Sequence, residues 1–474
     1  MTMANNKTIH ILRYGTIAEK IHLEKAISAY DYLGINGNSA AFVSNAIAKF
    51  IVQKFFSRKD KGYFIDPITY AFQNKIELLM STSKATGKKS IKKSIAKLIE
   101  YYGYPINKVE SGSSICPDDF SDDNIKENFV EKVLSFQYDL VYNHIKEQDL
   151  QKYLDYVTPN QAKNIPQFRP KFLIAPYFYL DSQDPRWRNW LNLNIEFAHI
   201  SMERFSKKLN LPIFSQIVID KSTLKNDDML NEIINRYSHI SCDGFTIWVD
   251  DLNEHDASFD ELSAFVKLLM GLKQKPVYNM YGGYFSILLT HKSTGLLSGV
   301  SHGLEYGESR MVFPVGGGIP VSKYYYMPLH QRLDFTKAYY LLEFANIIDT
   351  TKENWGSSDM YYKEICRCSQ CKKVIKDQMI NFVEFESREF YEVHRKDQIL
   401  RRKKASSDTK ENCLYHYLLC KKIEFSKVRE QNIYDLLDEL QVNMEKYQQC
   451  EFLKDDSFDY VSVWKAVCEN ILER

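Results

Sequence analysis

Short apolar segments alternate with amphipathic helical stretches along most of the chain. Runs of β-branched and aromatic residues bounded by turn residues predict strands. These runs are Tyr63–Asp66, Lys171–Leu180, Pro212–Asp220, Gly244–Asp250, Pro276–Tyr281 and Leu297–His302. An earlier run, His10–Tyr14, predicts a first strand, and Met311–Pro314 predicts a further one. Apolar residues at helical spacing predict helices, which are Asp123–Glu147, Arg188–Leu209, Met229–Tyr237 and Phe259–Leu272.

Acidic residues recur where the predicted strands end. They are Asp66, Asp181, Asp220 and Asp250, each at the end of a strand or directly after it. Because the carboxyl ends of parallel strands face the active site in α/β proteins, these acids predict a polar mouth. Aspartate is also common at helix N-caps and in turns, so a purely structural role stays open for each of them.

The composition limits the class of protein only broadly. The chain has 474 residues, nine cysteines and a formal net charge of +1, so nucleic-acid binding would depend on local basic patches. Its apolar runs fall short of the roughly 18–20 residues needed to cross a bilayer, and its polar N-terminus lacks a signal-peptide core. We therefore expect a cytoplasmic protein with no membrane partner, whose cysteines are free thiols or metal ligands.

The most specific motif is a set of closely spaced cysteines, Cys366, Cys368 and Cys371. Three thiolates this close can bind one ion, and Zn²⁺ prefers four Cys or His ligands in tetrahedral geometry. We predict His416 as the fourth ligand, because it opens a strong helical pattern and a helix would hold it rigidly. The alternative ligands are His394, Cys413 and Cys420.

These patterns together predict the domain organisation. Repeated strand–helix units are typical of an α/β protein, here a (β/α)8 TIM-like barrel with a C-terminal zinc-binding subdomain. An open doubly wound sheet is the alternative. We expect an N-terminal segment with helices and the first strand over 1–60 and the barrel body over 61–345. The zinc subdomain, with a charged insertion, is expected over 346–450, and a closing helix over 451–474.

A Cys-x-Cys-x-x-Cys motif followed by a distant histidine, late in such a barrel, resembles the tRNA-guanine transglycosylase family. In that family the zinc subdomain interrupts the end of the barrel and supports nucleic-acid binding. The family's histidine follows the last cysteine at a distance that His394 matches, whereas the helical context favours His416. The resemblance includes the branch that inserts 7-deazaguanines into DNA.

The resemblance also implies site residues upstream. Asp66 matches the family's general acid/base, although Pro67-Ile-Thr69 replaces the Ser-Gly-Gly that follows it there. Asp181 and Gln216 match residues that read the purine edge, and Tyr179 and Trp248 are aromatic residues suited to stacking on the base. Core packing is the alternative role for each aromatic residue.

The nucleophile of the family is an aspartate after a late strand. The matching region, Gly299–Arg310, contains no aspartate. We predict Glu305 in this role, with Glu308 as the alternative, or a changed chemistry marked by His302. In base exchange, one carboxylate attacks the sugar and the other transfers a proton to and from the bases.

Two basic segments complete the prediction. Lys92 and Lys93 end a Lys-rich segment, and Arg401 and Arg402 open another, so both segments could contact phosphates. Each is also compatible with a solvated charged surface. The expected partners are tRNA or DNA, a purine or 7-deazapurine base, and a second copy of the chain or other proteins. The alternative function is a repurposed, non-catalytic member that binds nucleic acid or a protein.

Overall fold

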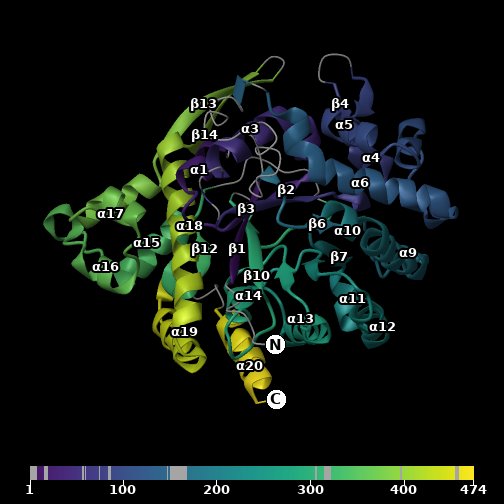
Figure 1. Cartoon of the computed structure of the whole chain (residues 1–474). Helices are drawn as coiled ribbons and strands as arrows, with labels where there is room; N and C mark the ends of the chain where they lie inside the picture. The colour runs from purple at the N-terminus through teal and green to yellow at the C-terminus, as the bar shows by residue number, and fades with distance from the viewer. Residues whose placement is uncertain are drawn as a thin grey trace.

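The computed structural model describes residues 8–14, 20–55, 58, 60–73, 75–83, 87–146, 148–149, 168–304, 307–313, 322–395, 398–453 and 458–473. Its centre is one parallel sheet of eight strands (Figure 1). The strands are β1 (Ile9–Tyr14), β2 (Tyr32–Asn36), β3 (Gly62–Asp66), β6 (Leu173–Ile174), β7 (Ile213–Ile219), β8 (Gly244–Val249), β9 (Val277–Asn279) and β10 (Gly299–Gly303).

The sheet curls into a nearly closed barrel. Its order is β3-β2-β1-β10-β9-β8-β7-β6, so each strand lies beside its neighbour in the chain and β10 returns to pair with β1. At the seam between β3 and β6, the N–H of Lys171 donates to the carbonyl of Tyr63 at 2.8 Å. A strand order of this kind defines a TIM-like barrel, which confirms the predicted α/β barrel body.

Aromatic rings fill the interior of the barrel on the amino-terminal side of the strand-end acids. The ring of Phe172 stacks on Phe64 and on Phe214, with centroids 4.6 Å and 4.2 Å apart. Gly34 and Gly244 make room for this layer, since a Cβ on either would lie within 3 Å of the Phe64 or the Phe214 ring. Strand residues alternate between inside and outside, so the next inward positions toward the carboxyl ends form a second layer.

Helices surround the sheet, and the eighth helix comes very late in the chain. The first seven units are covered by helices that include α3 (Ser44–Phe55), α6 (Asp123–His144), α9 (Trp187–Ile200), α12 (Asp227–Ser238), α13 (Phe259–Leu272) and α14 (Tyr284–Leu288). The helix that packs between α14 and α1 (Lys20–Lys25) is α18 (Ser407–Glu430). It therefore occupies the position of the helix that follows β10.

The segment between β10 and α18 is an insertion into the last barrel unit. It contains β11 (Tyr324–Tyr326), β12 (Gln331–Leu333), α15 (Phe335–Phe344), α16 (Asp359–Glu364), α17 (Ser369–Ile375) and the ribbon β13 (Arg388–Arg395) and β14 (Gln398–Ala405). In Figure 1, α15, α16 and α17 lie on the side of α18 that faces away from the strands. The chain ends with α19 (Ile433–Gln448) and α20 (Tyr460–Leu472), and α20 packs on α13.

Several strand predictions are corrected in detail. The first strand predicted at His10–Tyr14 is present as β1, and β2 in the same segment 1–60 also belongs to the barrel sheet, so the barrel begins at Ile9. Residues Met311–Phe313, predicted as part of a strand, form none. Lys171–Leu180 pairs continuously only at β6, with one isolated bridge from Leu180 to Ile219.

Within the part of the chain that the structure describes, no helix is long and apolar enough to cross a membrane.

Two buried histidines lie between the barrel wall and α18. The Nε2 atoms of His10 on β1 and His302 on β10 are 3.1 Å apart, and Phe425 of α18 stacks on the His10 ring. Burial lowers the pKa of His10 to about 4 and lowers that of His302 well below its usual value. Both imidazoles are therefore neutral near pH 7, and one donates to the other.

This pair predicts a loss of stability in mild acid. The charges around it are Asp31, which accepts from the His10 backbone, and the cations Lys61, Lys421 and Arg332. The unfolded chain takes up protons below about pH 6.5 while the folded chain does not, so stability falls as pH falls. Each such histidine should lower the free energy of unfolding by about 1.4 kcal/mol per pH unit in this range.

The contribution is measured by denaturant unfolding of the wild type and His302→Gln between about pH 5 and 6.5. Glutamine can still hydrogen-bond to His10 but cannot titrate, so the variant should show the shallower pH dependence. If the free energy of unfolding changed equally with pH in the two proteins, His302 would be shown to take up a proton in the folded state as well.

Candidate metal centre and barrel mouth

A buried cluster of cysteines and one histidine lies between α18 and the inserted segment. The ligand atoms of Cys366, Cys368, Cys371 and His416 all lie within 4.8 Å of one another. His416 Nδ1 is 3.1 Å from Cys371 Sγ and 3.5 Å from Cys368 Sγ. Bond lengths of about 2.3 Å to sulfur and 2.0–2.1 Å to nitrogen separate tetrahedral ligand atoms by about 3.5–3.8 Å. The cluster therefore has dimensions that fit one metal ion.

The cysteine turn is organised by its own backbone. The Cys368 residue is the N-cap of α17, and its sulfur accepts from the backbone N–H of Cys371 at 3.3 Å. The sulfur of Cys366 accepts from the N–H of Cys368 at 3.4 Å. Amide N–H groups directed at sulfur stabilise the thiolate form, which is the form that binds a metal.

Neighbouring groups orient the fourth ligand. The Nε2–H of His416 donates to the carbonyl of Tyr325 at 2.7 Å, so Nδ1 carries the lone pair that faces the sulfurs. The ring of Tyr324 stacks on the imidazole with centroids 4.6 Å apart. The hydroxyl of Tyr361 lies 3.0 Å from Cys371 Sγ. These contacts form the outer shell that metal-binding histidines and thiolates usually have.

The alternative fourth ligands differ in their distance from the cluster. Cys413 is turned away, because its thiol donates to the carbonyl of Phe385 at 3.5 Å. Cys420 lies one helical turn after His416, and its sulfur is 3.6 Å from both Cys366 Sγ and His416 Nδ1. The imidazole of His394 falls outside the described side chains. The ribbon β13–β14 lies between the last cysteine and His416, which accounts for their long separation in sequence.

The thiols differ in their proton affinity. Burial raises the pKa of Cys371 and Cys420 well above the usual value, whereas hydrogen bonds from neighbouring thiols lower the pKa of Cys368. Several buried thiolates cannot coexist without a compensating positive charge. A bound cation supplies that charge, so the donor set itself favours a metal.

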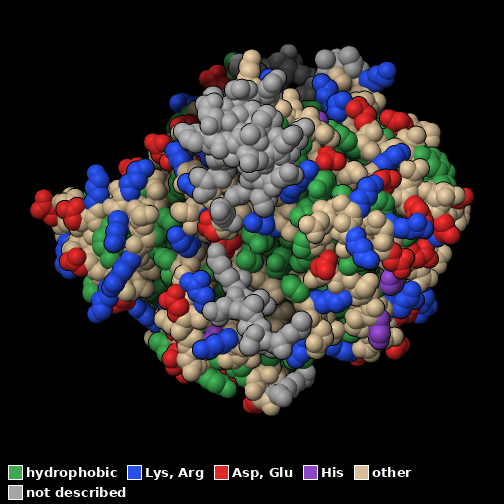
Figure 2. Space-filling model, viewed as in Figure 1, with side chains coloured by type: hydrophobic (Ala, Val, Ile, Leu, Met, Phe, Trp, Pro, Cys, Tyr) green, Lys and Arg blue, Asp and Glu red, His purple; other side chains and the backbone are tan. Residues whose placement is uncertain are grey.

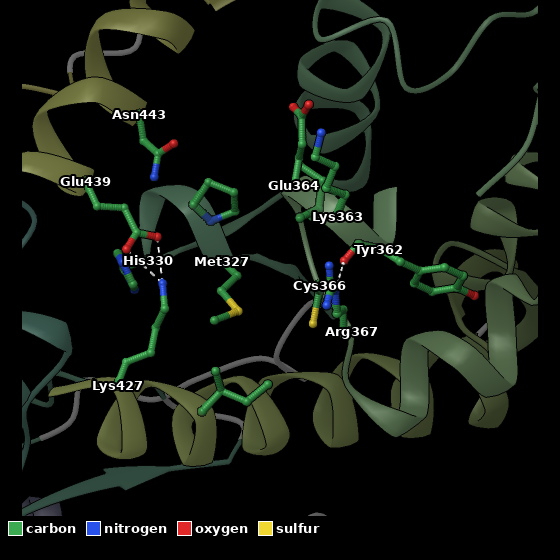
Figure 3. A pocket seen from close by; sticks show the side chains of 13 residues that line it. Met327, His330, Tyr362, Lys363, Glu364, Cys366, Arg367, Lys427, Glu439 and Asn443 are labelled. Atoms are coloured by element: carbon green, nitrogen blue, oxygen red, sulfur yellow. Dashed lines mark hydrogen bonds and ion pairs between the residues drawn. The ribbon is translucent and has the colours of Figure 1, made fainter. Parts of the chain in front are cut away.

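A pocket adjoins the metal cluster, between the η7 turn (Met327–Leu329), α16, α18 and α19. Figure 3 shows Cys366 and Arg367 on one side and an ion pair between Lys427 and Glu439 on the other. This pair has an N–O distance of 2.6 Å, and Lys446 forms a second pair with Glu364. The pocket has a volume of about 270 Å³.

Asp66 lies at the carboxyl end of β3, in the polar layer above the aromatic rings. Its Oδ2 is 3.1 Å from the Arg13 guanidinium, and its Oδ1 accepts from the Tyr177 hydroxyl at 2.5 Å and from the Ile68 N–H at 3.1 Å. The Arg13 guanidinium also donates to Asn36. The carboxylate of Asp66 is fully buried. The predicted acid/base is thus a buried, fully hydrogen-bonded carboxylate.

The predicted base-reading residues are spread around the same end of the barrel. Gln216 lies buried in the middle of β7, where its Oε1 accepts from Thr246 at 3.0 Å and its Nε2 has no partner among the described residues. Asp181 lies in a turn, where it accepts from the N–H of Gln183. Asp181 and Gln216 therefore share no hydrogen-bond partner among the described residues.

Tyr179 and Trp248 are both buried and take part in packing. Tyr179 donates to Asp250 at 3.0 Å, while Trp248 donates to the carbonyl of Arg310 at 3.0 Å. The strand-end acid Asp220 caps the N-terminus of α11 (Lys221–Lys225). Among the strand-end acids, Asp66 and Asp250 thus connect segments at the ends of different strands, and Asp220 and Asp181 serve a helix and a turn.

A hollow of about 280 Å³ lies at this mouth, just below the range of about 300–1,000 Å³ that is typical of ligand pockets. Its lining comes from the segments after β2, β3, β9 and β10, and includes Asn36, Tyr70, Lys92, Tyr281, Arg310 and Phe313. Of these residues, only Lys92 was predicted from the sequence to contact a ligand. The signal for Arg13 beneath them was a lone cation at an inward position of the apolar strand β1.

The alternatives to the predicted nucleophile lie away from the mouth pocket. Glu305 falls outside the described residues. Glu308 is nearly buried against α18, where it forms an ion pair with Lys421 at 2.7 Å and accepts from Tyr417 at 3.1 Å. His302 faces α18 through its contact with His10. Neither Glu308 nor His302 lines the mouth pocket.

The basic residues predicted to contact nucleic acid are exposed where they are described. Lys92 lies at the rim of the mouth pocket, and Lys93 begins α5 (Lys93–Tyr102). Arg401 lies on β14 with its guanidinium 4.2 Å from the Phe390 ring, and Arg402 is the next residue on that strand. The hairpin β4 (Met80–Thr82) and β5 (Lys89–Ile91) and the ribbon β13–β14 both extend toward the upper edge of Figure 1.

The visible surface has no single sign of charge. Figure 2 shows Lys and Arg side chains interspersed with Asp and Glu over the face in view. The formal net charge of +1 agrees with this mixed surface. Any electrostatic attraction of nucleic acid therefore depends on individual basic residues and not on a general positive field.

No protein-family model matches the chain, and no curated protein matches its sequence. Fold and site alone thus define the class: a parallel, TIM-like α/β barrel with a buried Cys₃His cluster that fits a metal ion.

Proposed function

We propose that the protein is a transglycosylase-like enzyme that exchanges a guanine-type base in tRNA or DNA. The observation that supports this function most is the position of Asp66. It is a buried carboxylate at the carboxyl end of a barrel strand, and it is hydrogen-bonded to Ile68, a residue that lines the mouth pocket. Active sites of TIM-like barrels lie at this end of the strands.

The proposed metal is Zn²⁺. Three thiolates and one imidazole in a closed, buried set are the ligands of structural zinc sites. Cys366, Cys368, Cys371 and His416 would hold the ion, and its role would be to join the inserted segment to α18. A closed set of four ligands has no open position for substrate, so the metal takes no part in the chemical step.

The proposed reaction has two displacements at the sugar carbon that carries the base. A carboxylate oxygen attacks this carbon, the carbon–nitrogen bond to the base breaks, and the departing base takes a proton from an acid. The incoming base then attacks the same carbon, displaces the carboxylate and gives its proton to the residue that was the acid. The chain of sugars and phosphates stays intact throughout.

Asp66 is proposed as the acid/base, and Glu305 remains the proposed nucleophile. Burial raises the pKa of Tyr177 well above its usual value, so its hydroxyl stays protonated and donates to Asp66. Arg13 compensates the negative charge of the carboxylate. Asp181 and Gln216 remain proposed for base reading, with the unpartnered Nε2 of Gln216 as a buried donor, and Tyr179 and Trp248 for stacking.

A second candidate function is non-catalytic binding of nucleic acid or of a protein. Both oxygens of Asp66 already have partners, and Glu308 is held by Lys421, which favours this function. The exposed ribbon with Arg401 and the hairpin before Lys92 would then be the contact surfaces. Homodimers or assemblies with other proteins are compatible with both functions.

Base exchange is tested with labelled guanine and labelled 7-deazaguanine precursors, offered with tRNA and with duplex DNA. Asp66→Asn should lower incorporation by at least about 100-fold, because the variant cannot transfer the proton. Asp220→Asn is the matched control, since asparagine caps a helix as well as aspartate does. Equal incorporation by Asp66→Asn would remove Asp66 from the mechanism, and no incorporation by folded, zinc-loaded wild type would favour the binding function.

A further inference from the structure

The floor of the mouth pocket carries more positive than negative charge. Arg13 is buried and Arg310 is partly buried there, and Asp66 is the carboxylate that faces them. Arg310 lines the pocket, whereas Arg13 lies below it and donates to Asn36, which is part of the lining. At the rim, Lys92 adds a cation and Glu77 an anion, so the positive excess comes from the two guanidinium groups. Burying a second guanidinium beside one carboxylate is costly unless a further anion arrives.

Arg13 also has unused hydrogen-bonding capacity. Its Nη2 donates to Asp66 and Asn36, but its Nε and Nη1 have no partner among the described residues. Only 4% of this residue is exposed, so these donors lack bulk water as well. Buried donors nearly always have an acceptor in a folded protein, so the two free donors indicate that an acceptor group belongs here.

One tyrosine connects the two guanidinium groups. Arg13 lies over the Tyr281 ring, 4.7 Å from its centroid, and Arg310 donates to the Tyr281 hydroxyl at 3.3 Å. Tyr70 and Phe313 also line the pocket, and their ring centroids lie 6.0 Å apart. The pocket thus combines a cationic floor with an aromatic wall, which suits a ligand that carries both an anionic group and a planar ring.

The pocket beside the metal cluster has a different electrostatic character. Of the cations that line it, Lys427 is paired with Glu439, and the exposed Arg367 donates to the carbonyl of Tyr362. Lys363 also lines the pocket and is exposed. These cations are paired or solvated, whereas Arg13 below the mouth pocket is buried with two donors that lack a partner among the described residues, so the mouth pocket is the better of the two for an anion.

We propose that the mouth pocket binds a nucleoside monophosphate unit, with its phosphate at Arg310 above Arg13 and its ring system against Tyr70 and Phe313. This inference rests on the proposed function and adds to it a phosphate subsite within the barrel mouth. A guanidinium fork matches the geometry of phosphate oxygens, and an aromatic wall stacks on a base of any sequence. The unit is either a free nucleotide or one residue of a nucleic acid.

Calorimetric titration of the full chain tests the inference with guanosine 5′-monophosphate, guanosine and inorganic phosphate. The monophosphate should bind at least about tenfold more tightly than guanosine, as expected for a charge-assisted contact. Arg310→Gln should remove this advantage, and Arg310→Lys should retain only part of it, because lysine keeps the charge but loses the fork. Arg188→Gln is the matched control, since Arg188 is an exposed arginine outside the pocket.

A short single-stranded oligonucleotide in the same titrations separates the two sources of the phosphate. Binding of the free nucleotide alone indicates a small-molecule ligand, while tighter binding of the oligonucleotide indicates a nucleic acid. Either result supports the inference if it depends on Arg310. Thermal unfolding of each variant shows whether the protein is still folded.

Equal affinity for guanosine and its monophosphate, or monophosphate binding that Arg310→Gln leaves unchanged in folded protein, would overturn the inference. The proposed function fails separately. Arg310-dependent binding without base exchange would keep the phosphate subsite and reject the transglycosylase. Base exchange without any Arg310-dependent binding would keep the transglycosylase and reject the phosphate subsite.

Discussion

Replacing Cys371 by serine is expected to abolish binding of the proposed zinc ion and unfold the segment inserted between β10 and α18. The sulfur of Cys371 is fully buried, 3.1 Å from His416 Nδ1, and a serine hydroxyl is a poor zinc ligand. Binding of structural zinc contributes about 10–16 kcal/mol to folding in small zinc domains. Because α18 carries His416 and also covers the barrel, the effect should extend to the barrel and lower the melting temperature of the whole chain.

Elemental analysis of the purified chain measures the metal, and limited proteolysis locates the unfolded part. Cys413→Ser is the matched control on the same helix, because a serine hydroxyl can also donate to the carbonyl of Phe385. This control should keep both the metal and the protease resistance. A full equivalent of zinc in Cys371→Ser would show that the ion is held by another set of atoms.

Cys420 decides how the ligand set is completed. Its sulfur lies as close to Cys366 as a fourth tetrahedral ligand would, yet His416 already has its lone pair directed at the sulfurs. With His416 as ligand, Cys420→Ser should retain zinc while His416→Ala loses it. The opposite pattern would give an all-cysteine site.

The barrel was predictable because its signal is local. Strands such as β7 and β8 are fully buried apolar runs, and their spacing with helices identifies parallel units without knowledge of contacts. β2 was missed because Tyr32–Asn36 is short, has a glycine at its centre and ends in asparagine. It forms because β1 and β3 provide partners on both sides, which is information that the segment itself does not contain.

The metal cluster was predictable because the spacing of its residues along the chain determines it. The mouth pocket was not, because it forms where segments distant in sequence come together. Three cysteines within six residues indicate a metal, and the helical pattern around His416 predicts the fourth member of the buried cluster. Arg310, in contrast, belongs to the pocket only because the segment after β10 lies beside Tyr281 of the segment after β9. Glu308 looked like a substitute for the missing nucleophile, but α18, distant in sequence, supplies the lysine that holds it.

Replacing Lys421 by methionine should be the most destabilising single change in the interface between the barrel and α18. The ammonium group of Lys421 is fully buried, 2.7 Å from Glu308 and 2.9 Å from Glu424, and it donates to the Tyr325 hydroxyl at 2.9 Å. Its removal leaves two carboxylates in the interior without their cation. Breaking a buried ion pair in this way costs about 3–5 kcal/mol.

Denaturant unfolding measures this loss, with Lys427→Met as the matched control. Lys427 lies on the same helix and pairs with Glu439 at 2.6 Å, but both side chains are partly exposed. Solvent screens such a pair, so its loss should cost about 0–1 kcal/mol. Equal losses in the two variants would mean that water reaches Lys421, contrary to its burial in the structure.

The pH dependence of the difference in unfolding free energy between wild type and Lys421→Met shows whether the lost charge causes it. Burial alone would raise the pKa of Glu424, but the charge of Lys421 and contacts with His330 and Tyr325 lower it to about 2. A carboxyl group with a lowered pKa stabilises the fold above its unfolded value of about 4.5, and this contribution is lost as pH falls toward 2. In Lys421→Met the carboxylates can take up protons, so the gap to wild type should narrow in acid. A gap that stays constant with pH would assign the loss to packing of the lysine stem and not to its charge.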